Sequence, residues 1–141
     1  MSLTYTLYID APAGQVQTAI SSARTVDDHD GEFTLESGLH FSIDEISGGK
    51  WTVAEDMGIK PRSAVRFFLD KSNDLDAQQI ALLRITLDLL GLIPGDAVLL
   101  FNGEWVWLLR QDHLTLNRSL WNENRLTIVS EPYELRAIPS I

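Results

Sequence analysis

The stretch from Ala97 to Arg110 constrains the fold more than any other part of this chain. It consists of two apolar, β-rich runs joined by Asn102-Gly103. An Asn-Gly link between such runs is the strongest short-range signal for a β-hairpin, because both central residues of a type I′ turn need a positive φ. The sequence therefore predicts a hairpin here.

A two-residue turn also predicts the register of this hairpin. Phe101 is then opposite Glu104, and the alternation of side chains along each strand defines two faces. The first face carries Val98, Leu100, Trp105, Trp107 and Leu109. The second face carries Ala97, Leu99, Phe101, Val106 and Leu108. Since both faces are apolar, the hairpin belongs in the centre of a sheet, and each face needs a cover.

Apolar and alternating runs predict the remaining strands. These runs lie at residues 3–9, 32–36, 39–46, 51–54, 65–69, 114–116 and 126–129. Residues 27–31 are acidic and contain glycine, which is typical of a loop. From Pro132 onward the sequence predicts an extended tail.

Two helices are predicted between these strands. Asp10-Ala11-Pro12 begins the first, since proline suits a first helical turn, and its apolar stripe continues toward Arg24. The second helix has a wider apolar stripe, formed by Ile80, Leu82, Leu83, Leu87, Leu89 and Leu90.

The ends of the second helix carry their own signals. Asp76 and Gln79 have the spacing of a capping box, and Asn73 or Asp74 is an alternative cap. Gly91 stands where a left-handed residue commonly ends a helix, with a proline shortly after it. The helix is therefore predicted to end at Gly91.

Together these elements predict an α+β fold with a single domain over residues 1–141. Its architecture is a two-layer sandwich, with a mainly antiparallel sheet and two helices on one face, similar to an elaborated ferredoxin-like fold. The chain has 45% hydrophobic and 22% charged residues, which are globular values. It contains no cysteine, so disulfides and thiolate metal sites are excluded.

Acidic side chains are concentrated in one part of the chain. Of 20 acidic and 11 basic residues, nine acidic and one basic lie between Thr25 and Ile59. A concentrated negative field repels nucleic acid and attracts basic partners, so no nucleic-acid partner is predicted. The ordinary alternative is a solvated acidic face that keeps a small domain soluble.

The amino terminus alternates between apolar and polar residues and does not resemble a signal peptide. No apolar run reaches the ~18 residues that cross a bilayer. We therefore expect a soluble, cytoplasmic protein with no membrane partner.

Motifs for catalysis and metal binding are weak. If Gly31 is the sixth residue of an EF-hand loop, Val26 and Ser37 occupy positions that need carboxylates, so this motif fails. The three histidines have no paired spacing, and no serine lies in a nucleophile elbow. We expect no enzyme activity, no catalytic residue, no metal and no cofactor, although a nonspecific cation site in the acidic loop stays open.

Several short segments of the second half occur in a distinctive order. They are Pro94-Gly95-Asp96-Ala97, Phe101-Asn102-Gly103-Glu104, Leu109-Arg110, Leu114-Thr115-Leu116-Asn117, Trp121 and Pro132-Tyr133. This order resembles the carboxyl-terminal half of the Sit immunity family, whose members protect bacteria against the swarm-inhibition toxins of kin. The resemblance covers residues 65–135 best and implies an immunity protein that binds a toxin.

Two hypotheses follow. In the first, the chain binds and neutralises a cognate, basic toxin through acidic and tryptophan side chains, namely Asp27, Asp28, Asp30, Glu32, Glu36, Asp44, Glu45, Trp105 and Trp107. In the second, it is a stand-alone small-molecule-binding or regulatory domain, and in either case a homodimer is an open alternative.

The two hairpin tryptophans have two interpretations. They either pack under the helices as core, with the segment from Asn117 to Ile141 shielding the reverse face, or remain partly open and contact a partner.

Overall fold

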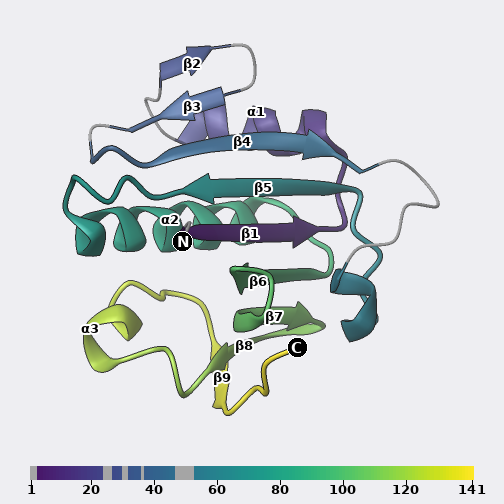
Figure 1. Cartoon of the computed structure of the whole chain (residues 1–141). Coiled ribbons are helices and arrows are strands. Elements are labelled where there is room, and N and C mark those ends of the chain that lie inside the picture. Colours follow the sequence, from purple (N-terminus) through teal and green to yellow (C-terminus); the bar gives the residue numbers. More distant parts are fainter. Residues whose placement is uncertain (1–2, 24–26, 30–31, 36, 47–52) are drawn as a thin grey trace.

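The computed structural model describes residues 3–23, 27–29, 32–35, 37–46 and 53–141 (Figure 1). Its elements in chain order are β1 (Thr4–Ile9), α1 (Ala13–Ala23), β2 (Asp27–His29), β3 (Glu32–Thr34), β4 (His40–Glu45), the 3-10 helix η1 (Val53–Met57), β5 (Ser63–Phe68), α2 (Leu75–Leu92), β6 (Ala97–Phe101), β7 (Trp105–Gln111), β8 (His113–Asn117), α3 (Glu123–Leu126) and β9 (Tyr133–Arg136). Among the described helices, none combines the length and apolar character needed to cross a bilayer.

The described strands form one sheet in the order β2-β3-β4-β5-β1-β6-β7-β8-β9. Neighbouring strands are antiparallel except for β8 and β9. The elements β1, α1, β4, β5, α2 and β6 repeat the β-α-β-β-α-β pattern of the ferredoxin-like fold, and β2, β3 and β7–β9 extend its sheet on both sides. The predicted elaborated ferredoxin-like fold is therefore confirmed.

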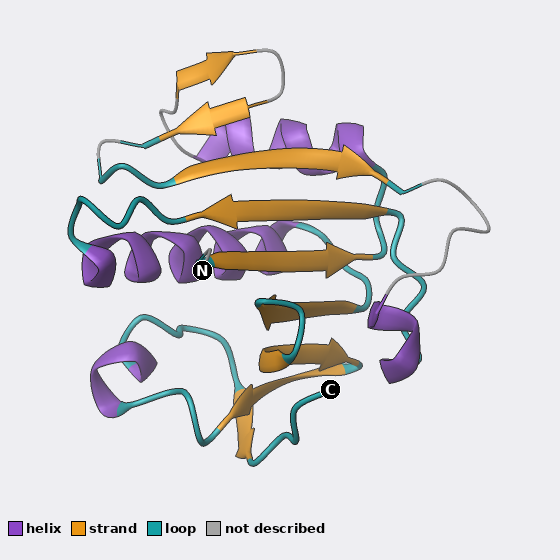
Figure 2. Cartoon of the chain, viewed as in Figure 1, coloured by secondary structure: helices purple, strands orange, loops and turns teal. Residues whose placement is uncertain are grey.

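Helices α1 and α2 lie on the same face of the sheet (Figures 1 and 2). The core between the two layers includes Leu7, Phe41 and Phe67 from the strands, each fully buried. The predicted stripe of α2 faces this core, because Leu83 is fully buried and Leu87 is 9% exposed. These helices therefore close one face of the sheet.

The ends of α2 differ from the first predictions. The cap is Asp74, the alternative candidate, whose side chain accepts a hydrogen bond from the backbone N–H of Ala77 at 3.2 Å. The helix continues through Gly91 to Leu92, so the predicted end at Gly91 is wrong. A left-handed glycine is not needed there, because the side chain of Arg110 donates hydrogen bonds to carbonyl groups at this end.

The hairpin is confirmed, but its predicted register is wrong. Asn102 and Gly103 have φ values of 50° and 76°, as a type I′ turn requires. However, Phe101 pairs with Trp105, and a β-bulge shifts the pairing further along the hairpin. Trp107 is the extra residue of this bulge.

The bulge also changes the composition of the two faces. Val106 joins Val98, Leu100 and Leu109 in one cluster, whereas Trp107 and Leu108 both belong to the core under the helices. Ala54 and Ile59, in and after η1, cover the first cluster, together with Ile138 of the tail. The predicted need for two covers is therefore met within the chain.

Three local predictions are also wrong. Residues 27–29, predicted as a loop, form strand β2, which pairs with β3. Val53 and Ala54 lie in η1 and not in a strand, while residues 51–52 are outside the described residues. The predicted strand at 126–129 is absent because Asn122 caps the short helix α3, which ends at Leu126.

Candidate functional site

The sheet face opposite α1 and α2 has two unlike halves. Along β3, β4 and β5 the inward residues Phe33, Phe41, Val65 and Phe67 are fully buried in the core. Side chains alternate along a strand, so their neighbours point to the opposite face. We call these neighbours the open face: Glu32, Thr34, His40, Ser42, Asp44, Arg66 and Phe68.

The register of the strands arranges the open face in rows. Thr34 is opposite His40, which is opposite Phe68 on the next strand. The His40 and Phe68 ring centroids are 6.1 Å apart, and Nδ1 of His40 is 3.2 Å from the hydroxyl oxygen of Thr34. Phe68 nevertheless stays 39% exposed. A large apolar ring thus lies on an otherwise polar surface.

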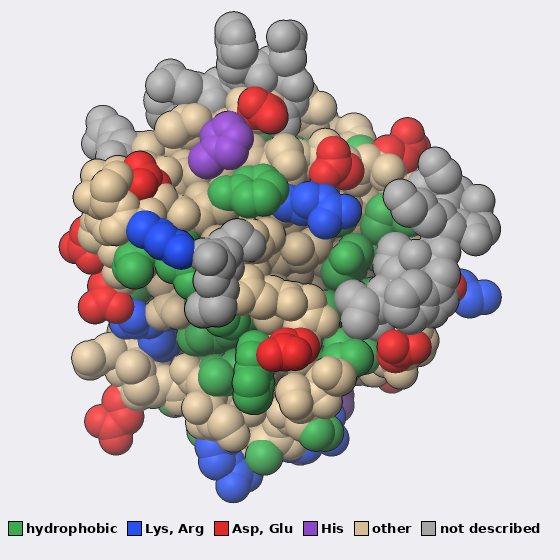
Figure 3. Space-filling model, viewed as in Figure 1, with side chains coloured by type: hydrophobic (Ala, Val, Ile, Leu, Met, Phe, Trp, Pro, Cys, Tyr) green, Lys and Arg blue, Asp and Glu red, His purple; other side chains and the backbone are tan. Residues whose placement is uncertain are grey.

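Charged side chains of both signs flank these rings. Nε of Arg66 donates a hydrogen bond to the Asp44 carboxylate at 3.1 Å. On the other side, Nε2 of His40 is 3.9 Å from the Glu32 carboxylate. Figure 3 shows this face, with a histidine, a large hydrophobic side chain and a basic side chain close together over β4 and β5 and acidic side chains around them.

The predicted acidic binding residues have different placements. Glu32, Asp44 and Glu45 are exposed on the neighbouring strands β3 and β4. Asp27 and Asp28 lie on the adjacent strand β2. Asp30 and Glu36 are outside the described residues.

Two further acids of this region, Glu55 and Asp56, lie on η1. This short helix contributes to the cover over the β6–β7 half of the sheet. The described acidic residues of this region therefore lie partly on the neighbouring strands β2, β3 and β4 and partly on η1.

The two predicted tryptophans differ in exposure. Trp105 is 45% exposed at the start of β7, whereas Trp107 is 7% exposed. The ring of Trp107 packs edge-on against Tyr5 and Trp121, and the Trp121 indole N–H donates to the Trp107 carbonyl at 2.7 Å. The core interpretation therefore holds for Trp107. Its burial corrects the prediction that Trp107 binds a partner. Of the two hairpin tryptophans, Trp105 is the accessible one.

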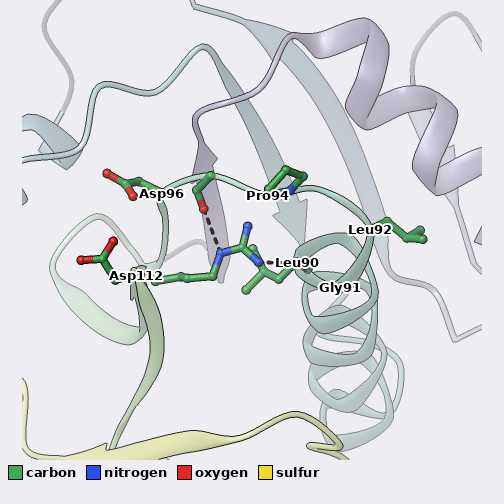
Figure 4. A pocket seen from close by; sticks show the side chains of 8 residues that line it. Leu90, Gly91, Leu92, Pro94, Asp96 and Asp112 are labelled. Atoms are coloured by element: carbon green, nitrogen blue, oxygen red, sulfur yellow. Dashed lines mark hydrogen bonds between the residues drawn. The ribbon is translucent and has the colours of Figure 1, made fainter.

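A hollow of about 500 Å³ lies at the carboxyl end of α2 (Figure 4). Arg110 lines this hollow and donates hydrogen bonds to the carbonyl groups of Leu90, Ile93 and Gly95. Burial lowers the pKa of Arg110, while the charges of Glu131 and Asp96 oppose this shift. The guanidinium is thus used to cap the helix.

A second hollow, of about 320 Å³, lies between η1 and the C-terminal tail. Met57, Leu109 and Ile138 contribute apolar walls, and Asp56 and Arg136 contribute one charge of each sign. Within the described ranges, no group of three histidine, aspartate or glutamate side chains is placed to hold a metal ion.

Sequence reasoning did not single out His40, Arg66 or Phe68 as surface residues of interest. Each stands at an outward-facing position of a strand whose side chains alternate between the two faces, and any half-exposed strand shows this pattern. Only the pairing of β4 with β5 brings the three side chains together. The missing information was therefore the order of the strands.

The comparisons with known proteins support the resemblance found in the sequence. A family model described as SitI3-like matches residues 3–125. Comparison with curated proteins and with solved structures gave no match. Because the matched residues span most of the chain, the protein belongs to the SitI3-like family, in agreement with its resemblance to the Sit immunity family.

Proposed function

We propose that this protein is an immunity protein that neutralises a cognate bacterial toxin by stoichiometric binding. The observation that carries the proposal is the match to the SitI3-like family over residues 3–125. Neutralisation by binding needs no catalytic residue, metal or cofactor in the immunity protein. In this proposal the protein acts in the cytoplasm, where it covers the toxin before the toxin reaches its target.

The proposed partner is basic. The chain has a net charge of −9, and exposed acids lie on β3 and β4. Such a field accelerates the encounter with a positively charged surface. We propose that Asp27, Asp28, Asp30, Glu32, Glu36, Asp44 and Glu45 supply this attraction and that Trp105 contributes an apolar contact.

The proposal is tested with the polypeptide encoded directly upstream of this gene. Its expression alone is expected to arrest growth of a host cell, and coexpression of this chain is expected to restore growth. Affinity purification of a catalytically inactive form of the toxin is expected to recover this chain with it. Arrest that persists despite abundant, folded immunity protein contradicts the proposal.

A further inference from the structure

Among the described residues, those that cover the sheet face opposite the helices pack on one half of it. There, Ala54, Ile59 and Ile138 pack on the apolar side chains of β6 and β7, including Val98 and Leu100. The open face on β3, β4 and β5 has a different composition, with a histidine, an arginine and an exposed phenylalanine. The two halves therefore differ in chemistry as well as in cover.

The open face has the layout of a protein-binding surface. Interface centres are enriched in aromatic and arginine side chains, and their rims are polar. Here Phe68 and Arg66 lie on one strand with His40 beside them, while Glu32 and Asp44 lie toward the margins. The central strands also hold these side chains on a rigid support.

The charge of the open face indicates which partner fits. The Glu32 and Asp44 side chains are 62% and 51% exposed, and the positive charge of Arg66 is already paired with Asp44. Two copies of the chain would repel each other as they approach, because each has a net charge of −9. A basic surface that carries an apolar group for Phe68 is complementary.

We propose that the open face is the contact surface for the toxin, with Phe68 as its apolar anchor and the neighbouring acids as partners for basic side chains. This inference rests on the proposed function and adds the location of the contact. In this arrangement the wider acidic field governs association, whereas the Phe68 contact governs dissociation.

The experiment measures binding of an inactive form of the cognate toxin to purified variants of the full chain. Phe68→Ala is expected to weaken binding about tenfold or more, mainly through faster dissociation. Leu92→Ala is the matched control, because Leu92 is 57% exposed at the end of α2 on a different part of the surface. Binding by this control is expected to match the wild-type protein.

The sign of the partner's charge is tested at Ser42, which lies between Glu32 and Arg66 in the register. Ser42→Arg is expected to weaken binding strongly, whereas Ser42→Glu is expected to weaken it far less because it adds a charge that the partner attracts. Circular dichroism and thermal unfolding establish that each variant is folded. Equal losses for the two substitutions overturn the assignment of a basic partner surface.

Three outcomes separate this inference from the proposed function. If the toxin binds the wild-type protein and all folded open-face variants equally, the contact surface is wrong while the immunity function stands. If the wild-type protein sediments as a dimer that Phe68→Ala dissociates, the open face is a self-interface and the proposal is overturned. Absence of any complex with the wild-type protein contradicts the proposed function itself.

Discussion

Arg110 shows how one side chain replaces an expected backbone signal. Its guanidinium donates to the carbonyl group of Leu90 in the last turn of α2 and to those of Ile93 and Gly95 just after the helix, where the sequence predicted a left-handed Gly91. Carbonyl groups at a helix end lack partners within the helix, so any nearby donor can satisfy them. Arg110 lies 18 residues after Leu92, so no local sequence pattern links it to the helix end. Sequence analysis missed its role for this reason.

Replacement of Arg110 is expected to destabilise the protein. Arg110→Ala leaves part-buried carbonyl groups without a donor and is expected to cost about 1–3 kcal/mol in the free energy of unfolding. Arg110→Lys keeps the charge but loses the planar fork, so an intermediate loss is expected. Urea unfolding measures both variants, and an unchanged midpoint for Arg110→Ala means that the helix end does not depend on this cap.

Asn117 is a second residue with a structural role at a distance. Its buried side chain donates to the carbonyl groups of Val106 and Ile138 and accepts from the Ile138 N–H. These bonds hold the C-terminal tail, and with it Ile138, over the apolar cluster of β6 and β7. The side chain thus links the hairpin to its cover.

Asn117→Ala is expected to loosen this tail. The lost bonds are expected to cost about 1–3 kcal/mol of stability and to increase hydrogen–deuterium exchange in residues 133–141. Asn124→Ala, the same change at an exposed position of α3, is the control and is expected to leave both unchanged. Equal exchange in the two variants means that Asn117 does not anchor the tail.

At the scale of elements, local sequence patterns predicted the hairpin turn correctly but did not predict the register of its strands. The hairpin turn was predictable because Asn102-Gly103 needs only its own backbone geometry. The register was not, because the bulge at Trp107 directs both Trp107 and Leu108 to the core under the helices. Strand β2 was missed because Asp27-Asp28-His29 has no apolar alternation and lies at the sheet edge.

The apolar stripe of α2 gives the element-scale prediction. Leu83 is fully buried against the core, so Leu83→Ala is expected to destabilise the protein by ~2–5 kcal/mol through the cavity that it leaves. Arg84 is exposed on the same helix, and Arg84→Ala is expected to stay within about 0.5 kcal/mol of the wild type. If a denaturant titration finds equal effects, the assignment of the buried helix face is wrong.

For the whole molecule, strand order was the information that the sequence lacked. The ferredoxin-like pattern of elements was readable, but the pairing of β1 with both β5 and β6 joins residues far apart in the chain. The open face exists only because β3, β4 and β5 are neighbours. Its candidate residues thus became visible only in three dimensions.

The net charge of −9 gives a prediction for the whole molecule. Association with a basic toxin is expected to slow as ionic strength rises, with little change in dissociation. Glu32→Gln with Glu45→Gln is expected to lower the association rate and to weaken its salt dependence. Stopped-flow measurements of the association rate at several salt concentrations test this prediction, with Glu123→Gln on α3 as the control. An association rate that does not depend on salt contradicts electrostatic steering.

The most direct test of neutralisation by binding is a titration of toxin activity with this protein. At toxin concentrations well above the dissociation constant, we predict that residual activity falls linearly and reaches its minimum at one immunity chain per toxin. Full inactivation by far less than one chain per toxin would indicate an enzymatic mechanism. Activity that persists at an excess of folded immunity protein contradicts neutralisation by stoichiometric binding.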